Sequence, residues 1–236
     1  MNPESLLFLD TETTGLEHGR LIQIAFKRRG DATTFVEYYK APVPIEFEAM
    51  GVHHITEAMV ADKPPFAETE TYKTLPATLD YSILVAHNAT YDVGILKTEG
   101  VETPLHICTY KVAYRLYDLP NHKLQTLRYR WGIEVPNAVA HDAAGDVDVL
   151  EKVFDYILND YVEKHSVSES DAIKEFVRIT QEPALLRRLS FGKNRGMTFD
   201  EILEKDPEYL RWLSTLADKD EDFKYTVRHY LNKLSA

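Results

Sequence analysis

An apolar segment that ends in two acidic residues limits the folds that are open to this chain. Residues 5–9 read Ser-Leu-Leu-Phe-Leu and pass directly into Asp10-Thr-Glu12, followed by a turn-forming Thr-Thr-Gly. The apolar run predicts a buried strand, and side chains two positions apart in a strand share a face. Asp10 and Glu12 are therefore predicted to lie side by side, where two like charges are costly unless a cation compensates them. A polar strand end is the alternative for such a pair in isolation.

Two further segments each place an aspartate near the start of a predicted helix, after an apolar run or a loop. His-Asn-Ala-Thr-Tyr-Asp92 follows an apolar run, and Asn88 or Thr90 is predicted to cap the helix that holds Asp92 in its first turn. His141-Asp-Ala-Ala-Gly-Asp146 places His141 just before another helix. The helix dipole alone would explain either aspartate. Taken together, the three elements indicate one site at the edge of a sheet.

The order of apolar segments predicts an α/β fold. Residues 21–29 and 33–40 flank Gly30-Asp31 and are expected to form a hairpin that continues from the first strand. Helical patterns follow, and Pro76 is expected to interrupt or end the first long one. A helix from Asp142 to about Lys164 is predicted to bury one apolar stripe, formed by Val147, Leu150, Val153, Phe154, Ile157 and Leu158. Asp142 and Asp148 are interpreted as solvated charges of this helix, with a role as rival ligands as the alternative.

A polar segment around residues 163–170 predicts a boundary between a larger domain, 1–165, and a small, mostly helical one, 166–236. The net charge of −11 argues at first against a nucleic-acid partner. Residues 187–196, however, carry four cations and no acid, and a protein that binds phosphate through metal ions needs carboxylates as well. The four cations are candidate DNA contacts, with a solvated loop as the alternative: Arg187, Arg188, Lys193 and Arg195.

The single cysteine excludes an internal disulfide and a cysteine-based zinc site. Cys108 is interpreted as a small buried hydrophobic residue, and a reducing cytoplasm is the simplest compartment. No apolar run approaches the ~18 residues of a membrane span, so no membrane association is expected, and we expect no signal peptide. Trp131 and Trp212 are interpreted as packing residues.

The segments DTETTG, HNATYD and HDAAGD resemble, in order, the three motifs of the DnaQ-like, DEDDh group of 3′→5′ exonucleases. Residues 53–64, 191–213 and 227–234 are similar to the bacterial exonuclease X subfamily, including its small C-terminal domain. The resemblance covers nearly the whole chain. It implies an RNase H-like fold, with a mixed five-stranded sheet flanked by helices and a small, mostly helical C-terminal domain.

The resemblance also implies a two-metal mechanism that releases 5′-mononucleotides from 3′ ends. Asp10, Glu12 and Asp146 would hold one cation, Asp10 would bridge to a second, and Asp92 would support it directly or through water. Oxygen ligands suit Mg²⁺, with Mn²⁺ as a substitute, better than zinc. His141, with an ordinary pKa near 6.5, would act as the general base.

Seven residues are implied as substrate contacts. Gly15 is expected to adopt a positive φ in a tight turn, Leu16 to pack against or wedge the terminal base, and His53, unlike the surface residue His54, to approach the substrate. Turn and cap roles explain the threonines, Gly15 and Asn88 equally well. The full set is Thr11, Thr13, Thr14, Gly15, Leu16, His53 and Asn88.

DNA 3′ ends, single-stranded or duplex, are the expected substrate, in repair or end trimming. An RNA-trimming enzyme of the same group is an alternative, because contacts to the 2′ position are not encoded in short motifs. A polymerase proofreading subunit that docks through its C-terminal region is another. A non-catalytic nucleic-acid-binding module is disfavoured, because the four carboxylates and His141 are all present. The sequence does not indicate the oligomeric state.

Overall fold

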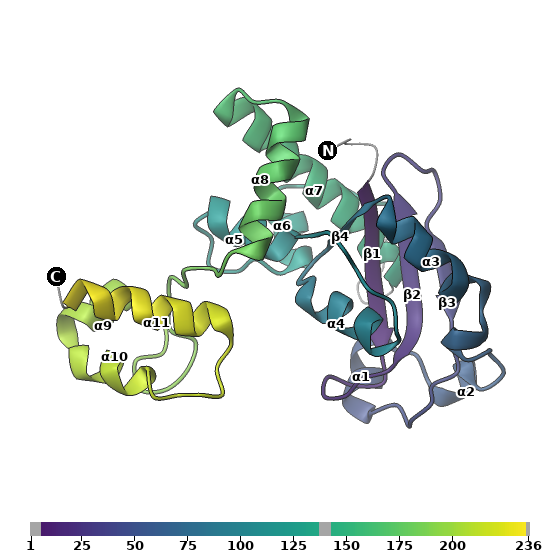
Figure 1. Ribbon diagram of the computed structural model, residues 1–236, viewed down its shortest axis with the longest axis horizontal. Coiled ribbons are helices and arrows are strands. Elements are labelled where there is room, and N and C mark those ends of the chain that lie inside the picture. The colour runs from purple at the N-terminus through teal and green to yellow at the C-terminus, as the bar shows by residue number, and fades with distance from the viewer. Residues whose placement is uncertain (1–5, 137–142, 235–236) are drawn as a thin grey trace. The chain divides into compact units, whose positions relative to one another are not determined.

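The computed structural model describes residues 6–136 and 143–234, and a mixed sheet of five strands forms its centre (Figure 1). The strands lie in the order β3-β2-β1-β4-β5. β2 runs antiparallel to β1 and β3, whereas β4 is parallel to β1 and β5 is parallel to β4. The bounds are β1 (Leu6–Thr13), β2 (Leu21–Arg28), β3 (Phe35–Tyr38), β4 (Ile83–Ala86) and β5 (His106–Cys108). The predicted fold class and the hairpin after the first strand are confirmed.

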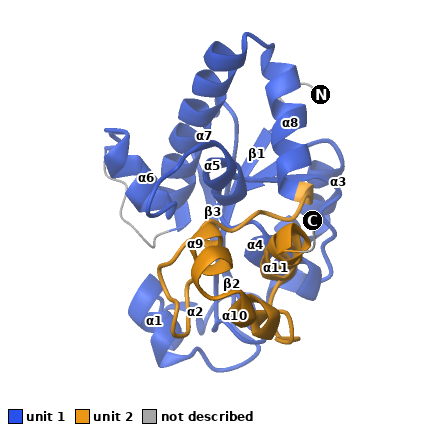
Figure 2. Ribbon diagram, turned by 90° about the vertical axis from the view of Figure 1, so that its left-hand side faces the viewer, with its two compact units in different colours: residues 1–180 blue, residues 181–236 orange. Residues whose placement is uncertain are grey.

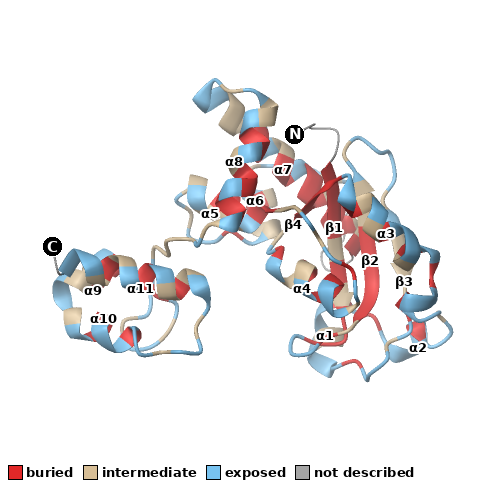
Figure 3. Cartoon of the chain, in the orientation of Figure 1, coloured by how far each residue is buried: buried red, intermediate tan, exposed pale blue. Residues whose placement is uncertain are grey.

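Side chains of β1 alternate between two apolar layers, one on each face of the sheet. Leu6 and Phe8 belong to the layer with α7, whereas Leu7 and Leu9 belong to the layer with α3 and α4. The buried residues follow β1, β2 and the inner sides of these helices (Figure 3). The first layer is completed by helices α5 (Thr109–Leu116), α6 (Leu124–Arg130), α7 (Ala143–His165) and α8 (Glu169–Gln181).

The opposite layer is covered by η2 (Phe66–Glu68), α3 (Glu70–Asp80) and α4 (Thr90–Thr98). A small separate cluster lies between β2 and the two short helices α1 (Phe47–His53) and α2 (Glu57–Val60). Every strand of the sheet's centre is therefore buried on both faces. This explains why β1 and β4 read as continuous apolar runs and not as alternating ones.

Helix α7 buries the stripe that the sequence predicts, with all six stripe residues at most 1% exposed. Phe154 meets Phe8 of β1 edge-on with ring centroids 5.5 Å apart, and it meets Phe176 of α8 at 6.1 Å. Asp148, interpreted as a solvated charge, has a side chain that is 42% exposed and accepts hydrogen bonds from Thr34 and Lys27. Within the described residues, no helix is long and apolar enough to cross a membrane.

Helix α3 contradicts the expectation that Pro76 would interrupt or end it. The helix runs from Glu70 to Asp80 with Pro76 inside it. Its beginning is fixed by Thr69, whose hydroxyl accepts a hydrogen bond from the backbone N–H of Tyr72. Leu75 and Leu79 are buried against the sheet. Tertiary burial of these leucines therefore outweighs the backbone hydrogen bond that proline removes.

The chain divides into two compact units, residues 1–180 and 181–236 (Figure 2). The division falls later than the predicted 165/166 boundary, because Ala172, Ile173 and Phe176 of α8 are buried in the core of the larger unit. The smaller unit contains α9 (Phe199–Lys205), α10 (Pro207–Leu213) and α11 (Glu221–Leu234), which share their own apolar core. Thr198 and Glu201 form a capping box at the start of α9.

Replacing Phe154 by alanine should reduce the free energy of unfolding by about 3–5 kcal/mol, because the change removes a fully buried ring and leaves a cavity. Urea denaturation followed by circular dichroism measures the effect. Lys152→Ala, at an exposed position of the same helix, should change stability by less than about 0.5 kcal/mol. Equal effects of the two changes would contradict the proposed packing of α7.

Candidate active site at the end of the central strand

Asp10 and Glu12 lie at the end of β1, on the face of the sheet that α7 covers. Phe8 belongs to the α7 layer, and alternation along the strand places Asp10 and Glu12 on the same face. The cross-strand register agrees, because Asp10 pairs with Ala25, which also belongs to that layer. Both carboxylates are only partly exposed. The predicted side-by-side arrangement at the edge of a buried strand is therefore present.

Asp146 lies in the first turn of α7, at the end of the helix where Ala143 and Gly145 are also buried. These small residues let the helix approach the sheet closely. The Asp146 side chain is 9% exposed and accepts a hydrogen bond of 2.6 Å from Nε2 of Gln125 in α6. A neutral amide thus holds this carboxylate on the face of the sheet that carries Asp10 and Glu12.

Asp92 lies in the first turn of α4, as predicted, and is 4% exposed. Its carboxylate accepts a hydrogen bond of 2.7 Å from the Thr11 hydroxyl. Burial raises the pKa of Asp92 to about 7, and the Thr11 hydrogen bond acts in the opposite direction. The predicted caps are wrong: the N-cap is Ala89 without a side-chain hydrogen bond, and Asn88 has φ of 68°.

His141 lies outside the described residues, as does Asp142. Among the described residues, no group of three or more His, Cys, Asp and Glu side chains is arranged to hold a metal ion. Asp92 and Asp146 are instead each held by a neutral donor, Thr11 and Gln125. The four predicted ligands are therefore located at one end of β1 and in the first turns of α4 and α7, without a formed coordination cluster.

One buried carboxylate and the chemistry of the donor set fit a cation at this end of β1. Asp92 is buried with an elevated pKa, and a nearby cation would favour its ionised form. The donor set is entirely oxygen, which suits Mg²⁺ or Mn²⁺.

A cleft of about 360 Å³ opens next to Glu12, between the end of β1, helix α1 and the start of α4. Five of the seven predicted substrate contacts line it. Leu16 is 83% exposed at its rim, and Asn88 reaches it through a left-handed backbone conformation that asparagine tolerates. The five predicted residues that line the cleft are Thr13, Gly15, Leu16, His53 and Asn88.

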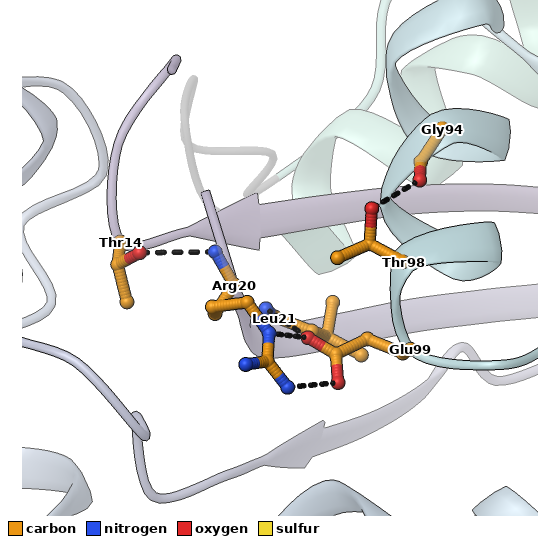
Figure 4. A network of polar contacts seen from close by, with 6 residues as sticks. All are labelled: Thr14, Arg20, Leu21, Gly94, Thr98 and Glu99. Carbon is orange, nitrogen blue, oxygen red and sulfur yellow. Dashed lines mark hydrogen bonds and ion pairs between the residues drawn. The ribbon is translucent and has the colours of Figure 1, made fainter. Parts of the chain in front are cut away.

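Thr11 and Thr14 do not line the cleft. Thr11 is buried against Asp92. Thr14 is 3% exposed, and its hydroxyl accepts a hydrogen bond of 3.0 Å from the backbone N–H of Arg20. The Arg20 guanidinium donates to both carboxylate oxygens of Glu99 after α4, at 2.7 and 2.9 Å (Figure 4). Thr14 therefore closes the loop between β1 and β2, and Glu99 fixes that loop beside α4.

Gly15 does not have the positive φ that the sequence suggested; the left-handed residue in this loop is His18, with φ of 56°. Glycine at position 15 leaves room for the end of the Glu46 side chain, which a Cβ there would displace. The Gly15 carbonyl oxygen accepts hydrogen bonds from the hydroxyls of Thr13 at 2.9 Å and Tyr91 at 3.1 Å. The turn is therefore held by side chains from β1, α1 and α4.

His53 lines the cleft, but both of its ring nitrogens have partners within the protein. The backbone N–H of Ile55 donates to Nδ1 at 2.9 Å, so Nε2 carries the proton and donates to the carbonyl of Thr13 at 3.2 Å. Burial lowers the pKa of His53, and the hydrogen bond to Thr13 opposes this shift. A neutral His53 therefore fixes the end of β1 to helix α1. His54 is exposed, as predicted.

The sequence pattern does not single out the other residues that line the cleft: Glu46, Glu48, Ala49, Val52 and Tyr91. Four of them belong to the segment around α1, which has no strong pattern in the sequence. Tyr91 directly precedes Asp92, yet a tyrosine beside a predicted ligand carries no signal of its own. Its hydroxyl contacts the Thr13 hydroxyl, and burial raises the pKa of Tyr91.

Similarity to known proteins identifies the family of this chain. A family model described as Exonuclease matches residues 7–154, and one described as Exodeoxyribonuclease X-like C-terminal matches residues 189–215. The chain belongs to the exonuclease family. It is 31% identical over 234 residues to Exodeoxyribonuclease 10 of Escherichia coli K12, covering 96% of this chain and 98% of that protein.

This exonuclease is also similar to a DNA polymerase subunit and to a solved exonuclease structure. It is 30% identical over 206 residues to the DNA polymerase III subunit epsilon of Haemophilus influenzae, covering 77% of this chain and 78% of that protein. The solved structure of exonuclease X in complex with 5′ overhanging duplex DNA matches with a TM-score of 0.59 and 28% identity, covering 74% of this chain and 99% of that chain. The predicted family, the RNase H-like fold and a hydrolytic nuclease activity are confirmed.

The four predicted DNA-contacting cations of the exonuclease lie in its smaller unit. Lys193 forms an ion pair of 2.7 Å with Asp206, and Arg188 donates to the carbonyl of Gly196 at 2.9 Å. Arg188, Lys193 and Arg195 are exposed, whereas Arg187 is partly buried. Arg188 and Lys193 are therefore engaged within the smaller unit itself.

Substituting alanine for Gly15 of the exonuclease should leave the free energy of unfolding within about 1 kcal/mol of the original, because the φ of this residue is not left-handed. The added methyl displaces only the mobile end of Glu46. Glu46 also lines the cleft, so its displaced carboxylate should weaken substrate binding, and a loss of about 1 kcal/mol corresponds to about a fivefold rise in KM. Kinetics on a 3′-labelled oligonucleotide and urea denaturation measure the two effects.

Removal of the Glu46 side chain in the Gly15→Ala background should restore KM. Gly51→Ala is the matched control, because a Cβ at that helical position meets open space. A large loss of stability in Gly15→Ala would instead indicate that the turn requires a left-handed residue.

Proposed function

We propose that this exonuclease removes 5′-mononucleotides from the 3′ ends of DNA, single-stranded or duplex, using two Mg²⁺ ions held by Asp10, Glu12, Asp92 and Asp146. The observation that carries the proposal is the cleft beside Glu12, because a terminal nucleotide in it would present its phosphate to the end of β1. Two relatives support a DNA substrate. One is named Exodeoxyribonuclease 10, and the other, exonuclease X, has been solved in complex with 5′ overhanging duplex DNA.

Proteins of this family generally use divalent metal ions. When bound, such ions would neutralise charge that develops on the attacking and leaving oxygens of the scissile phosphate. Asp10, Glu12 and Asp146 would hold one of them on the α7 face of β1, with Asp92 supporting the other from α4. Thr11 keeps Asp92 oriented through its hydrogen bond of 2.7 Å. Gln125, which donates to Asp146 at 2.6 Å, would either give up this hydrogen bond or keep it while Asp146 also binds the ion.

His141 would take the proton from the attacking water. It precedes Asp146 by five residues and the first residue of α7 by two, so it is close in sequence to one of the proposed ligands. A histidine is about half neutral near pH 6.5, and the neutral form is the base. Activity should therefore require a neutral imidazole at position 141, and it should fall as the pH decreases through the pKa of that ring.

The cleft would hold the terminal nucleoside through apolar and backbone contacts. Leu16 at the rim, Ala49 and Val52 provide apolar surface for a sugar or base. The turn at Gly15 is fixed by Thr13 and Tyr91 and so offers backbone groups in a fixed position. Preorganised contacts of this kind position the scissile bond without a loss of conformational entropy at the moment of reaction.

Removal of a proposed ligand tests the site. Asp146→Asn or Asp10→Asn should lower kcat by on the order of 10³-fold, because several kcal/mol of charge stabilisation are lost. Digestion of 3′-labelled single-stranded DNA, duplex DNA and RNA with Mg²⁺, Mn²⁺ or EDTA measures this effect. A calorimetric titration with Mg²⁺ should detect weaker binding in the same variants, independently of turnover.

Asp148→Asn is the matched control, since this carboxylate lies two residues along α7 but contacts Thr34 and Lys27. It should keep near-normal kcat and Mg²⁺ affinity. Cleavage that persists in EDTA, or release of nucleotides from the 5′ end, would refute the proposed function. Faster digestion of RNA than of DNA would change the substrate assignment but not the mechanism.

Leu16→Ala should impair duplex ends more than single strands, because a side chain that packs against or wedges the terminal base is needed where that base is paired. Burial of a leucine against a base is worth about 1–2 kcal/mol, so kcat/KM on blunt duplex DNA should fall by about 5- to 30-fold. Phe47→Ala is the control, since Phe47 is 85% exposed and does not line the cleft. Equal losses on both substrates would exclude this role of Leu16.

A further inference from the structure

The smaller unit presents an exposed pair of stacked aromatic rings. Trp212 of α10 is 48% exposed, although its sequence pattern suggested a packing residue. Its indole stacks on the ring of Tyr209 with centroids 5.0 Å apart and an interplanar angle of 26°. Tyr209 itself is 9% exposed and belongs to the core of the unit. Trp212 is therefore supported on one side by a fixed ring and accessible to solvent elsewhere.

The cationic loop, residues 191–196, is fixed next to these rings. Gly192 has a φ of 70°, and a Cβ at this position would overlap the Tyr209 hydroxyl, so only glycine lets the loop lie there. Nζ of Lys193 is 4.7 Å from the centroid of the Tyr209 ring and 2.7 Å from Asp206. Asn194 donates to the same carboxylate at 3.1 Å. The loop and α10 thus form one structured surface.

The smaller unit, unlike the rest of the chain, has no net negative charge that would repel a polyanion. Residues 181–236 contain ten Lys and Arg and ten Asp and Glu, so the net charge of −11 falls on residues 1–180. Arg195 is exposed, and its guanidinium makes no ion pair or hydrogen bond with another described residue. Lys193 and Arg195 therefore supply cations within the loop that is fixed to Tyr209.

We infer that Trp212, Tyr209 and the cationic loop form a binding site for an unpaired DNA strand, in which a base stacks on Trp212 and Lys193 and Arg195 contact phosphates. The inference rests on the proposed function and assigns its C-terminal unit a substrate class. An aromatic ring with neighbouring cations is the combination that single-stranded nucleic acid needs, and stacking accepts any base. A protein partner is less suited, because the neighbours of Trp212 along α10, Glu208 and Arg211, are exposed and charged, whereas interface cores are depleted of charge.

Tryptophan fluorescence provides a direct test, because the chain has only two tryptophans. Trp131 stacks on Tyr156 at 4.3 Å in the larger unit. Trp131→Phe therefore leaves Trp212 as the single tryptophan and changes no residue of the smaller unit. Oligo(dT) of about 16 nucleotides should quench its fluorescence when added in EDTA, where no digestion is expected. The affinity of Trp212→Ala, measured by anisotropy of labelled oligo(dT), should be about 10- to 100-fold lower.

Tyr225→Ala is the matched control, since this ring is 40% exposed in the same unit, on α11. It should bind oligo(dT) like the original chain. Lys193→Gln with Arg195→Gln should weaken binding and reduce its dependence on salt. Circular dichroism of each variant should match the parent, so that a loss of affinity reports the contact and not unfolding.

The outcomes separate this inference from the proposed function. Normal digestion of DNA with unchanged Trp212 fluorescence and unchanged affinity in Trp212→Ala would overturn the stacking site and leave the proposed function standing. Quenching and weakened binding without any digestion by the parent would support the stacking site and refute the proposed function. Stronger quenching by duplex DNA than by oligo(dT) would also overturn the inference, since paired bases do not expose their faces.

Discussion

Burial of β1, the central strand whose last residues carry charge, determines where the other elements of the larger unit lie. Leu6, Leu7, Phe8 and Leu9 are completely buried between two helical layers, and the strand then continues into Asp10 and Glu12 without a break in its backbone pairing to β2 until Glu12. Helices α7 and α4 must pack closely enough to bury the apolar part, and this brings their first turns to its charged end. The position of the carboxylates is therefore a consequence of packing the core.

Much of this arrangement follows from the sequence because the signals are local and mutually consistent. The β1 run, the hairpin around Gly30 and the stripe of α7 each have a clear period, and they agree on one layered fold. The location of Asp92 and Asp146 in first helical turns follows from the same segmentation. In contrast, β5 has only three residues, from His106 to Cys108, which is too short for a periodic pattern.

Other features depend on contacts that no local pattern contains. Pro76 remains inside α3 because Leu75 and Leu79 are buried on a sheet formed elsewhere in the chain. The space at Gly15 is filled by Glu46, thirty-one positions away, and the φ of this glycine is not left-handed. Helix α8 joins the larger unit through Phe176, although the polar segment before it suggested a boundary. In each case a long-range contact outweighs a local preference.

The uneven division of charge between the two units affects how a nucleic acid first meets the protein. The larger unit carries the whole excess of negative charge, and it also holds the cleft in which the chain end would react. A polyanion at long range is repelled by this unit and not by the smaller one, which has no net charge. Added salt screens that repulsion over a few ångströms to about 10 Å. Ionic strength should therefore act in opposite directions on the two units, speeding the encounter with the larger one while loosening phosphate contacts on the smaller.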